Sequence, residues 1–145
     1  MPSIDKIDWH SGGNFPDDLP PENGGTHIGM FLTWIIDNDL LGEWHLENSM
    51  SSIQAVKSRQ MTGRDFLIEE CDAKFWDEDL NKEGLEFTKY YYDDEKMNLY
   101  INDYEELLGD ELETLYHVEN SWSNYDRLRK RIDERYLDWK IKISD

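Results

Sequence analysis

The sequence has little positive charge. It contains 15 Lys and Arg residues against 33 Asp and Glu residues, which gives a formal net charge of -18 at pH 7. Nucleic acids and anionic membrane surfaces are themselves negatively charged and attract proteins through lysine and arginine. The charge balance therefore predicts that neither is a partner, and it favours a basic protein partner instead.

Cysteine and long apolar segments are also scarce. The single cysteine, Cys71, cannot form a disulfide within the chain, which is typical of proteins in a reducing compartment. The longest apolar run covers residues 30–36, whereas a membrane-spanning helix needs roughly 20 residues. The first residues lack the basic and apolar regions of a signal peptide. We therefore expect a cytoplasmic protein that does not bind a membrane.

Motifs for catalysis, nucleotide binding and metal binding are missing as well. The chain has no G-x-S-x-G, H-E-x-x-H, paired C-x-x-C or Walker pattern. Its four histidines are far apart in the sequence and never recur at the spacing of metal ligands; they are His10, His27, His45 and His117. Each is predicted to be a capping or surface residue, and Cys71 to be a buried, inert thiol. The sequence thus predicts no catalytic, cofactor-binding or metal-binding residue.

Aromatic residues, in contrast, are abundant. Six Trp, eight Tyr and five Phe make up 13% of the 145 residues. Large rings bury much apolar area per residue, so a hydrophobic core can form despite the high charge. A chain of this length is expected to form one domain, here residues 1–145.

The spacing of apolar residues predicts a mainly α fold. Residues 27–38 are apolar on nearly all sides and follow a capping residue, Thr26, so they are expected to form a central, buried helix. Residues 123–143 carry apolar side chains three and four positions apart, which predicts a long amphipathic C-terminal helix. A capping box, Ser123-x-x-Asp126, would begin it.

The N-terminal segment and one short apolar run are harder to assign. Residues 1–25 contain many glycines and prolines, which predicts an irregular lead-in packed on the core. Its expected anchors are Trp9, Phe15 and Leu19. Residues 97–101 could form a small β element or an extended connector, because a run this short cannot be assigned from its period.

Shorter helices are expected between these elements. A short helical piece is expected at residues 43–47, and a further turn of helix at residues 75–80. Thr62 and Asn81 each stand directly before an apolar periodic run, and both residue types favour the N-cap position. Each is therefore predicted to begin a helix.

The negative charge is concentrated in the middle of the chain. Residues 65–119 contain 19 acidic and four basic residues, a net charge of -15, whereas residues 1–64 carry -5 and residues 120–145 carry +2. The same stretch is rich in aromatic residues, which disordered acidic tails lack. The sequence therefore predicts a folded acidic surface.

Two acidic clusters in this stretch, residues 77–79 and 93–95, each follow aromatic residues. At protein interfaces, tyrosine and tryptophan supply contact area, and carboxylates pair with arginine or lysine. The predicted partner-binding residues are Trp76, Asp77, Glu78, Asp79, Tyr91, Asp93, Asp94, Glu95 and Tyr100.

Motifs at both ends of the chain resemble a family of small uncharacterised bacterial proteins. They are Ile7-Asp8-Trp9-His10, Phe15-Pro16, Leu19-Pro20, Gly25-Thr26-His27-Ile28-Gly29-Met30-Phe31, Tyr116-His117-Val118-Glu119, Trp122 and Tyr125-Asp126. Small acidic bacterial proteins of this kind are similar to the immunity partners of secreted polymorphic toxins. This resemblance implies a cytoplasmic inhibitor that neutralises a basic toxin domain, such as a nuclease, and it transfers no site residues.

Two other functions stay open. His10, Asn14 and His27 lie near glycine-rich turns and could line the pocket of a small-molecule-binding protein or enzyme. Alternatively, the chain could form a homodimer or larger structural oligomer through its C-terminal helix. The basic residues at 127–135 would then meet the acidic middle of a neighbouring copy.

Overall fold

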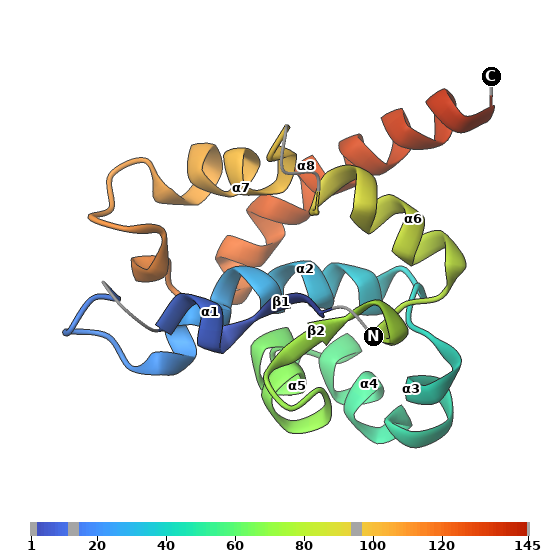
Figure 1. Cartoon of the computed structure of the whole chain (residues 1–145), viewed down its shortest axis with the longest axis horizontal. Coiled ribbons are helices and arrows are strands. Elements are labelled where there is room, and N and C mark those ends of the chain that lie inside the picture. The colour runs from blue at the N-terminus through green and yellow to red at the C-terminus, as the bar shows by residue number, and fades with distance from the viewer. Residues whose placement is uncertain (1–2, 12–14, 94–96, 145) are drawn as a thin grey trace.

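Helix α2 (Thr26–Asp37) lies at the centre of the computed structural model, which describes residues 3–11, 15–93 and 97–144 (Figure 1). Every residue of α2 from 26 to 36 is buried. Its sequence is apolar on all sides, so the free energy of burial favours a position where other elements can cover the whole helix. The predicted central helix is confirmed.

Three short helices cover one side of α2: α3 (Glu43–Asn48), α4 (Met50–Lys57) and α5 (Gly63–Glu70) (Figure 1). The predicted helix at residues 43–47 is thus confirmed. Helix α5 crosses α2 at very short range. A Cβ atom on Gly63 would lie 2.0 Å from the carbonyl oxygen of Gly29, and a Cβ on Gly29 would lie 2.4 Å from the backbone nitrogen of Arg64. The two backbones can touch only because glycine occupies both positions.

The other side of α2 is covered by α6 (Lys82–Tyr91), α7 (Leu99–Tyr104) and α8 (Trp122–Ser144) (Figure 1). A π-helical turn, Glu105–Gly109, continues α7, and a 3-10 turn, η4 (Leu115–His117), precedes α8. Residues 99–101 are helical, so the β element expected at 97–101 is wrong. A short apolar run takes the conformation that its neighbours allow, and here it forms the first turn of α7, where Tyr100 packs against Phe31 of α2.

A two-stranded antiparallel sheet instead pairs β1 (Ser3–Lys6) with β2 (Lys74–Trp76). The expectation that residues 1–25 are irregular is wrong for much of this segment, because β1 is followed by α1 (Ile7–Ser11) and later by a 3-10 turn, η1 (Pro21–Gly25). Ile7 is buried and anchors the segment, whereas the predicted anchor Trp9 is 58% exposed. Strand pairing with a distant segment, which no local pattern encodes, explains the difference.

Two of the predicted helix caps are confirmed and two are wrong. Thr26 is the first residue of α2 and not its cap, because Gly25 holds the N-cap position and no side chain caps the helix. The Thr62 side chain accepts a hydrogen bond from the Asp65 amide at the start of α5, and that of Asn81 accepts one from the Gly84 amide at the start of α6. At α8, however, the amide of Asn124 donates to Ser121 Oγ, so the helix begins before the predicted Ser123 cap.

The long C-terminal helix is confirmed, but its end leaves the body of the structure (Figure 1). Tyr125, Leu128, Ile132 and Trp139 are buried, whereas Ile143, the last residue of the predicted apolar stripe, is 59% exposed. The apolar stripe is therefore uncovered in the last turn of α8, where Lys142 Nζ donates to the Tyr90 hydroxyl at 3.3 Å.

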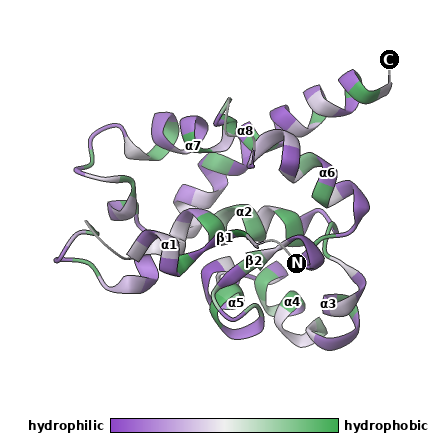
Figure 2. Ribbon diagram, viewed as in Figure 1, coloured by the Kyte–Doolittle hydropathy of each residue, from purple (hydrophilic) through white to green (hydrophobic). Residues whose placement is uncertain are grey.

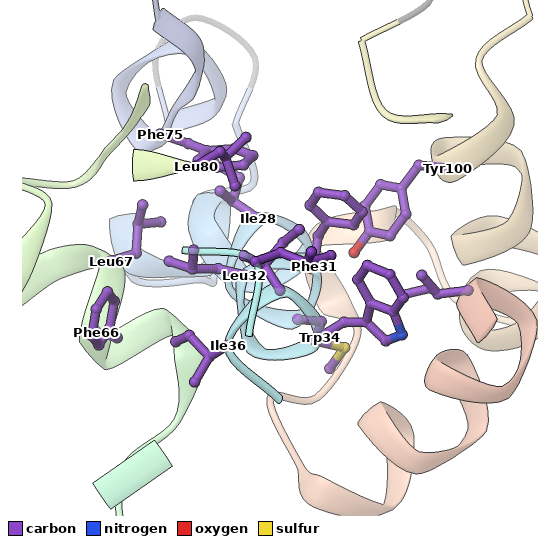
Figure 3. Close-up of a cluster of buried hydrophobic side chains, with 14 of the residues drawn as sticks. Ile28, Phe31, Leu32, Trp34, Ile36, Phe66, Leu67, Phe75, Leu80 and Tyr100 are labelled. Carbon is purple, nitrogen blue, oxygen red and sulfur yellow. The ribbon is translucent and has the colours of Figure 1, made fainter. Parts of the chain in front are cut away.

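Aromatic rings fill the core around α2 (Figure 3). Phe31 and Trp34 stack with centroids 6.2 Å apart, and Phe31 also contacts Phe87 and Tyr100. Figure 2 shows the same division by hydropathy: α2 is largely hydrophobic, whereas the outer helices alternate between hydrophobic and hydrophilic residues. The acidic residues thus surround a core built mainly from aromatic and branched aliphatic side chains.

Candidate functional site

A hollow of about 310 Å³ opens where α3 meets the segment after β2. It is lined by Trp44, Trp76, Glu78 and Asp79. Trp44 lies in the first turn of α3 and is 57% exposed, and Glu78 is exposed in the 3-10 turn η2 (Asp77–Asp79). Two tryptophan rings and two carboxylates therefore border one hollow. We call this hollow the acidic groove.

Asp79 is the buried member of the acidic groove. Its Oδ1 accepts a hydrogen bond from His45 Nε2 at 2.8 Å, and its Oδ2 accepts one from the Trp76 amide at 2.8 Å. On the other side of the ring, His45 Nδ1 is hydrogen-bonded to the Ser49 hydroxyl at 3.0 Å. The sequence predicted His45 as a capping or surface residue, whereas the structure buries it as the support of Asp79.

Cys71 lies next to this network, with Sγ 3.7 Å from His45 Nε2. Burial raises the pKa of its thiol well above the usual range, and the negative charges of Asp79 and Glu70 raise it further. A thiol with so high a pKa holds its proton at neutral pH and is a poor nucleophile. The prediction of a buried, unreactive thiol agrees with this position.

The predicted partner-binding residues separate into three groups. Trp76, Glu78 and Asp79 meet at the acidic groove, and half-buried Asp77 begins the same turn. Asp93 is exposed just after α6. Asp94 and Glu95 lie outside the described residues, so the second acidic cluster is seen only in part.

Two of the predicted aromatic anchors are core residues. Tyr91 and Tyr100 are both 0% exposed. The Tyr91 hydroxyl donates to Asp103 at 2.7 Å, and that of Tyr100 donates to the backbone carbonyl of His27. Neither ring reaches the surface, so neither can meet a partner in this structure. Composition alone does not separate core tyrosines from exposed ones, because both satisfy their hydroxyl with a hydrogen bond.

A second candidate site is built on Asp5. This residue lies in β1, His10 lies in α1 and His27 lies in the first turn of α2. His10 Nε2 donates to Asp5 Oδ1 at 2.7 Å, and His27 Nε2 donates to Asp5 Oδ2 at 3.2 Å. The two imidazole rings meet edge to face, with centroids 4.4 Å apart. We call these three residues the Asp-His cluster.

Two tyrosines complete the surroundings of the Asp-His cluster. The Tyr92 hydroxyl donates to Asp5 Oδ2 at 2.5 Å, and the Tyr116 hydroxyl lies 2.9 Å from His10 Nδ1. A hollow of about 200 Å³ is bordered by all three members of the cluster, and a neighbouring hollow of about 240 Å³ is bordered by His10, His27 and Tyr116. The cluster is therefore reachable from solvent.

Burial and hydrogen bonding set the charges in the Asp-His cluster. Burial alone would raise the pKa of Asp5, but hydrogen bonds from His10 and His27 outweigh it and hold this pKa well below its usual range. For His27, burial lowers the pKa, and the neighbouring Asp5 offsets only part of this effect. The site thus pairs a carboxylate with an imidazole that is neutral at physiological pH.

The sequence named His10 and His27 as pocket residues in an alternative interpretation, and the structure brings both together; Asn14 lies outside the described residues. Asp5 was missed. No motif marks it, because its position opposite the histidines depends on the pairing of β1 with β2.

A family comparison bears on these sites. The model of the family described as Domain of unknown function (DUF7832) matches residues 3–118, which is most of the chain. The chain belongs to this family. Comparisons with curated proteins and with solved structures found no match. The match includes the acidic groove and the Asp-His cluster and ends before α8.

The four arginines of α8 are engaged within the chain. Arg131 and Arg135 donate to Asp103, Arg129 donates to Asp126, and Arg127 donates to the carbonyl of Leu107. If α8 paired with a second copy through these arginines, the contacts within the chain would have to be replaced, and homodimer formation stays a prediction.

Among the described residues, no helix is both long and apolar enough to cross a membrane.

Proposed function

We propose that this protein is an acidic binding protein that neutralises a basic protein partner, acting as a cytoplasmic immunity protein against a secreted toxin domain of the nuclease type. The observation that carries this proposal is the acidic groove. Trp44 and Trp76 border it together with the carboxylates of Glu78 and Asp79. It lies within a chain whose net charge is -18.

The lining of the acidic groove fits a cationic side chain. A guanidinium or ammonium group binds the face of a tryptophan ring through the ring quadrupole. A carboxylate accepts charge-assisted hydrogen bonds from the same group, and arginine can make two of them at once. Trp44 and Glu78 are exposed and provide these two kinds of contact without rearrangement of the core.

Charge complementarity selects the kind of partner. The active cleft of a nuclease is positive because it holds phosphate groups, and carboxylates can take the place of those phosphates. The large negative charge of this chain would also speed association through electrostatic steering. Fast association suits a protein that protects its own cell from a toxin.

The proposal is tested in two steps. The tagged full-length protein is incubated with native lysate, the bound proteins are eluted along a salt gradient, and they are identified by mass spectrometry. The purified partner is then assayed for nuclease activity with and without equimolar immunity protein. We expect a basic partner that elutes at high salt and loses its activity in the complex. A partner that is acidic, or whose binding does not weaken with salt, would contradict the proposal.

One observation favours a second candidate function, the binding or conversion of a small ligand at His10 and His27. Both histidines converge on Asp5 beside two hollows, so that acid, base and carboxylate groups lie within reach of one bound molecule. Perturbed titratable groups that line a hollow are characteristic of ligand sites.

A further inference from the structure

The Asp-His cluster has the donor set of a metal site. One donor atom each from Asp5, His10 and His27 lies within 4.8 Å of the other two. We propose that these three side chains bind a divalent transition-metal ion, with Zn²⁺ as the reference ion. This inference concerns the second candidate function and does not depend on the acidic groove.

The donor atoms are of the right kind and are close to the right spacing. Two imidazoles and one carboxylate are ligands that zinc and similar ions prefer, with bond lengths of roughly 2.0–2.2 Å. Neighbouring ligands in a tetrahedral site of that size are about 3.3 Å apart. His10 Nε2 lies 2.7 Å from Asp5 Oδ1 and His27 Nε2 lies 3.2 Å from Asp5 Oδ2, so the two histidines contact different oxygens of one carboxylate. A bound ion therefore requires the side chains to move apart, so that both nitrogens and a carboxylate oxygen surround it.

The protons can be rearranged to free the metal-binding nitrogens. In the metal-free cluster each Nε2 carries the hydrogen that it donates to Asp5. When the proton of each histidine moves from Nε2 to Nδ1, both Nε2 lone pairs become available to the ion. At His10, the Tyr116 hydroxyl beside Nδ1 can then accept a hydrogen bond instead of donating one. A partner of this kind orients metal-binding histidines in many proteins.

The cluster combines rigidity with access. Asp5 and His27 are buried and come from separate elements that the core holds in place, while the His10 side chain is 23% exposed. The hollows beside the histidines leave room for water or a substrate group to complete the coordination shell. Three protein ligands with one open position are typical of catalytic zinc sites.

A second group of donors serves as an internal comparison. His45, Cys71 and Asp79 also lie within 4.8 Å of one another, but all three are buried. The carboxylates of the two groups are alike in accepting a backbone amide, Asp79 from Trp76 and Asp5 from Lys6, so burial and the sulfur atom distinguish the groups. Cys71 is the only cysteine of the chain, so binding there would give a thiolate-to-metal absorption band with Co²⁺, whereas the Asp-His cluster has no sulfur.

The test titrates the full-length, chelator-treated protein with ZnCl₂ by calorimetry and with CoCl₂ by absorption spectroscopy. We expect one ion per chain and a Co²⁺ spectrum without a thiolate band. His10→Gln should weaken Zn²⁺ binding more than Tyr116→Phe, which removes only the partner of a ligand and should cost about 10–100-fold. The matched control is His117→Gln, because His117 also pairs with a carboxylate, Asp18, at 3.0 Å.

Three results would overturn the inference. They are the absence of saturable binding, equal affinity in wild type and in a folded His10→Gln variant, and a thiolate band that disappears in Cys71→Ser. Circular dichroism spectra and melting temperatures establish that each variant is folded. If His10→Gln does not fold, Tyr116→Phe decides the question, since an unchanged affinity in that variant also contradicts the proposal.

Discussion

Asp103 and Arg135 form a two-bond ion pair across the interface of α7 and α8, with Nε and one terminal nitrogen of the arginine each 2.9 Å from a carboxylate oxygen. Asp103 is 1% exposed and also accepts hydrogen bonds from Arg131 and Tyr91. One buried carboxylate therefore joins α6, α7 and α8. This contact explains why the basic face of α8 packs against α6 and α7, which belong to the acidic stretch of residues 65–119.

Replacement of Asp103 by Asn is expected to lower the free energy of unfolding by about 3 kcal/mol, because two guanidinium groups lose their shared partner. Arg131 and Arg135 remain partly exposed and can reach water, which keeps the loss at the lower end of the range for buried pairs. Urea denaturation measures this loss. The control Asp110→Asn removes an exposed carboxylate from the same region and should change little.

The same residue predicts a pH dependence. Burial raises the pKa of Asp103, but hydrogen bonds from Arg135, Tyr91 and Arg131 outweigh it, so the pKa in the folded state is lowered. A lowered pKa adds stability above the ordinary value of 3.8 and loses it as the pH falls toward the folded value. Denaturation curves at decreasing pH should therefore show the difference between wild type and Asp103→Asn shrinking below about pH 4. A constant difference would contradict the assignment.

The cap of α6 gives a smaller effect that can be tested cleanly. The Asn81 side chain accepts the Gly84 amide at 2.8 Å. Asn81→Ala should cost about 1 kcal/mol, whereas Asn81→Ser, which keeps a side-chain acceptor, should cost much less. The urea midpoints of the two variants measure this difference. Equal losses of stability in both variants would show that the capping hydrogen bond does not account for the effect.

A substitution at the contact between α2 and α5 is expected to cause a larger loss of stability. Gly63→Ala would place a methyl group against the Gly29 carbonyl and the Thr33 hydroxyl, at 2.0 Å from each oxygen. The helices would have to separate, at a cost of about 3 kcal/mol or more. Gly109→Ala is the comparison, because its new methyl group meets the movable end of the Leu115 side chain at 2.5 Å. Similar melting temperatures for the two variants would contradict this reading of the helix contact.

The fold could be predicted where the information is local. The apolar residues of α2 and the three- and four-residue spacing in α8 identify both helices, and Thr62 and Asn81 mark the starts of two others. The sheet could not be predicted, because β1 and β2 are short and nearly 70 positions apart. Asp5 could not be predicted as a site residue for the same reason, because its position depends on this long-range pairing.

The candidate sites could be predicted in part. Clustered acids next to Trp76 pointed to the segment that forms the acidic groove, but Trp44, the most exposed ring there, was not among the predicted residues. Tyr91 and Tyr100 carry the same local signals as surface tyrosines, and only their packing against Phe31 reveals them as core. Convergence of distant side chains requires the tertiary structure.

The central claim is that the acidic groove binds a cationic partner, and the affinity of the Glu78→Lys variant for that partner tests it most directly. Asp138→Lys is the control: it makes the same charge change at an exposed position on α8, which contributes no residue to the lining of the groove. Binding is measured at two salt concentrations for both variants and the wild type. The proposal predicts that Glu78→Lys weakens affinity at least about tenfold and reduces its salt dependence, as for a charge at an interface centre, while Asp138→Lys changes both slightly. Equal effects of the two substitutions would show that net charge alone matters and would contradict a specific site at the groove.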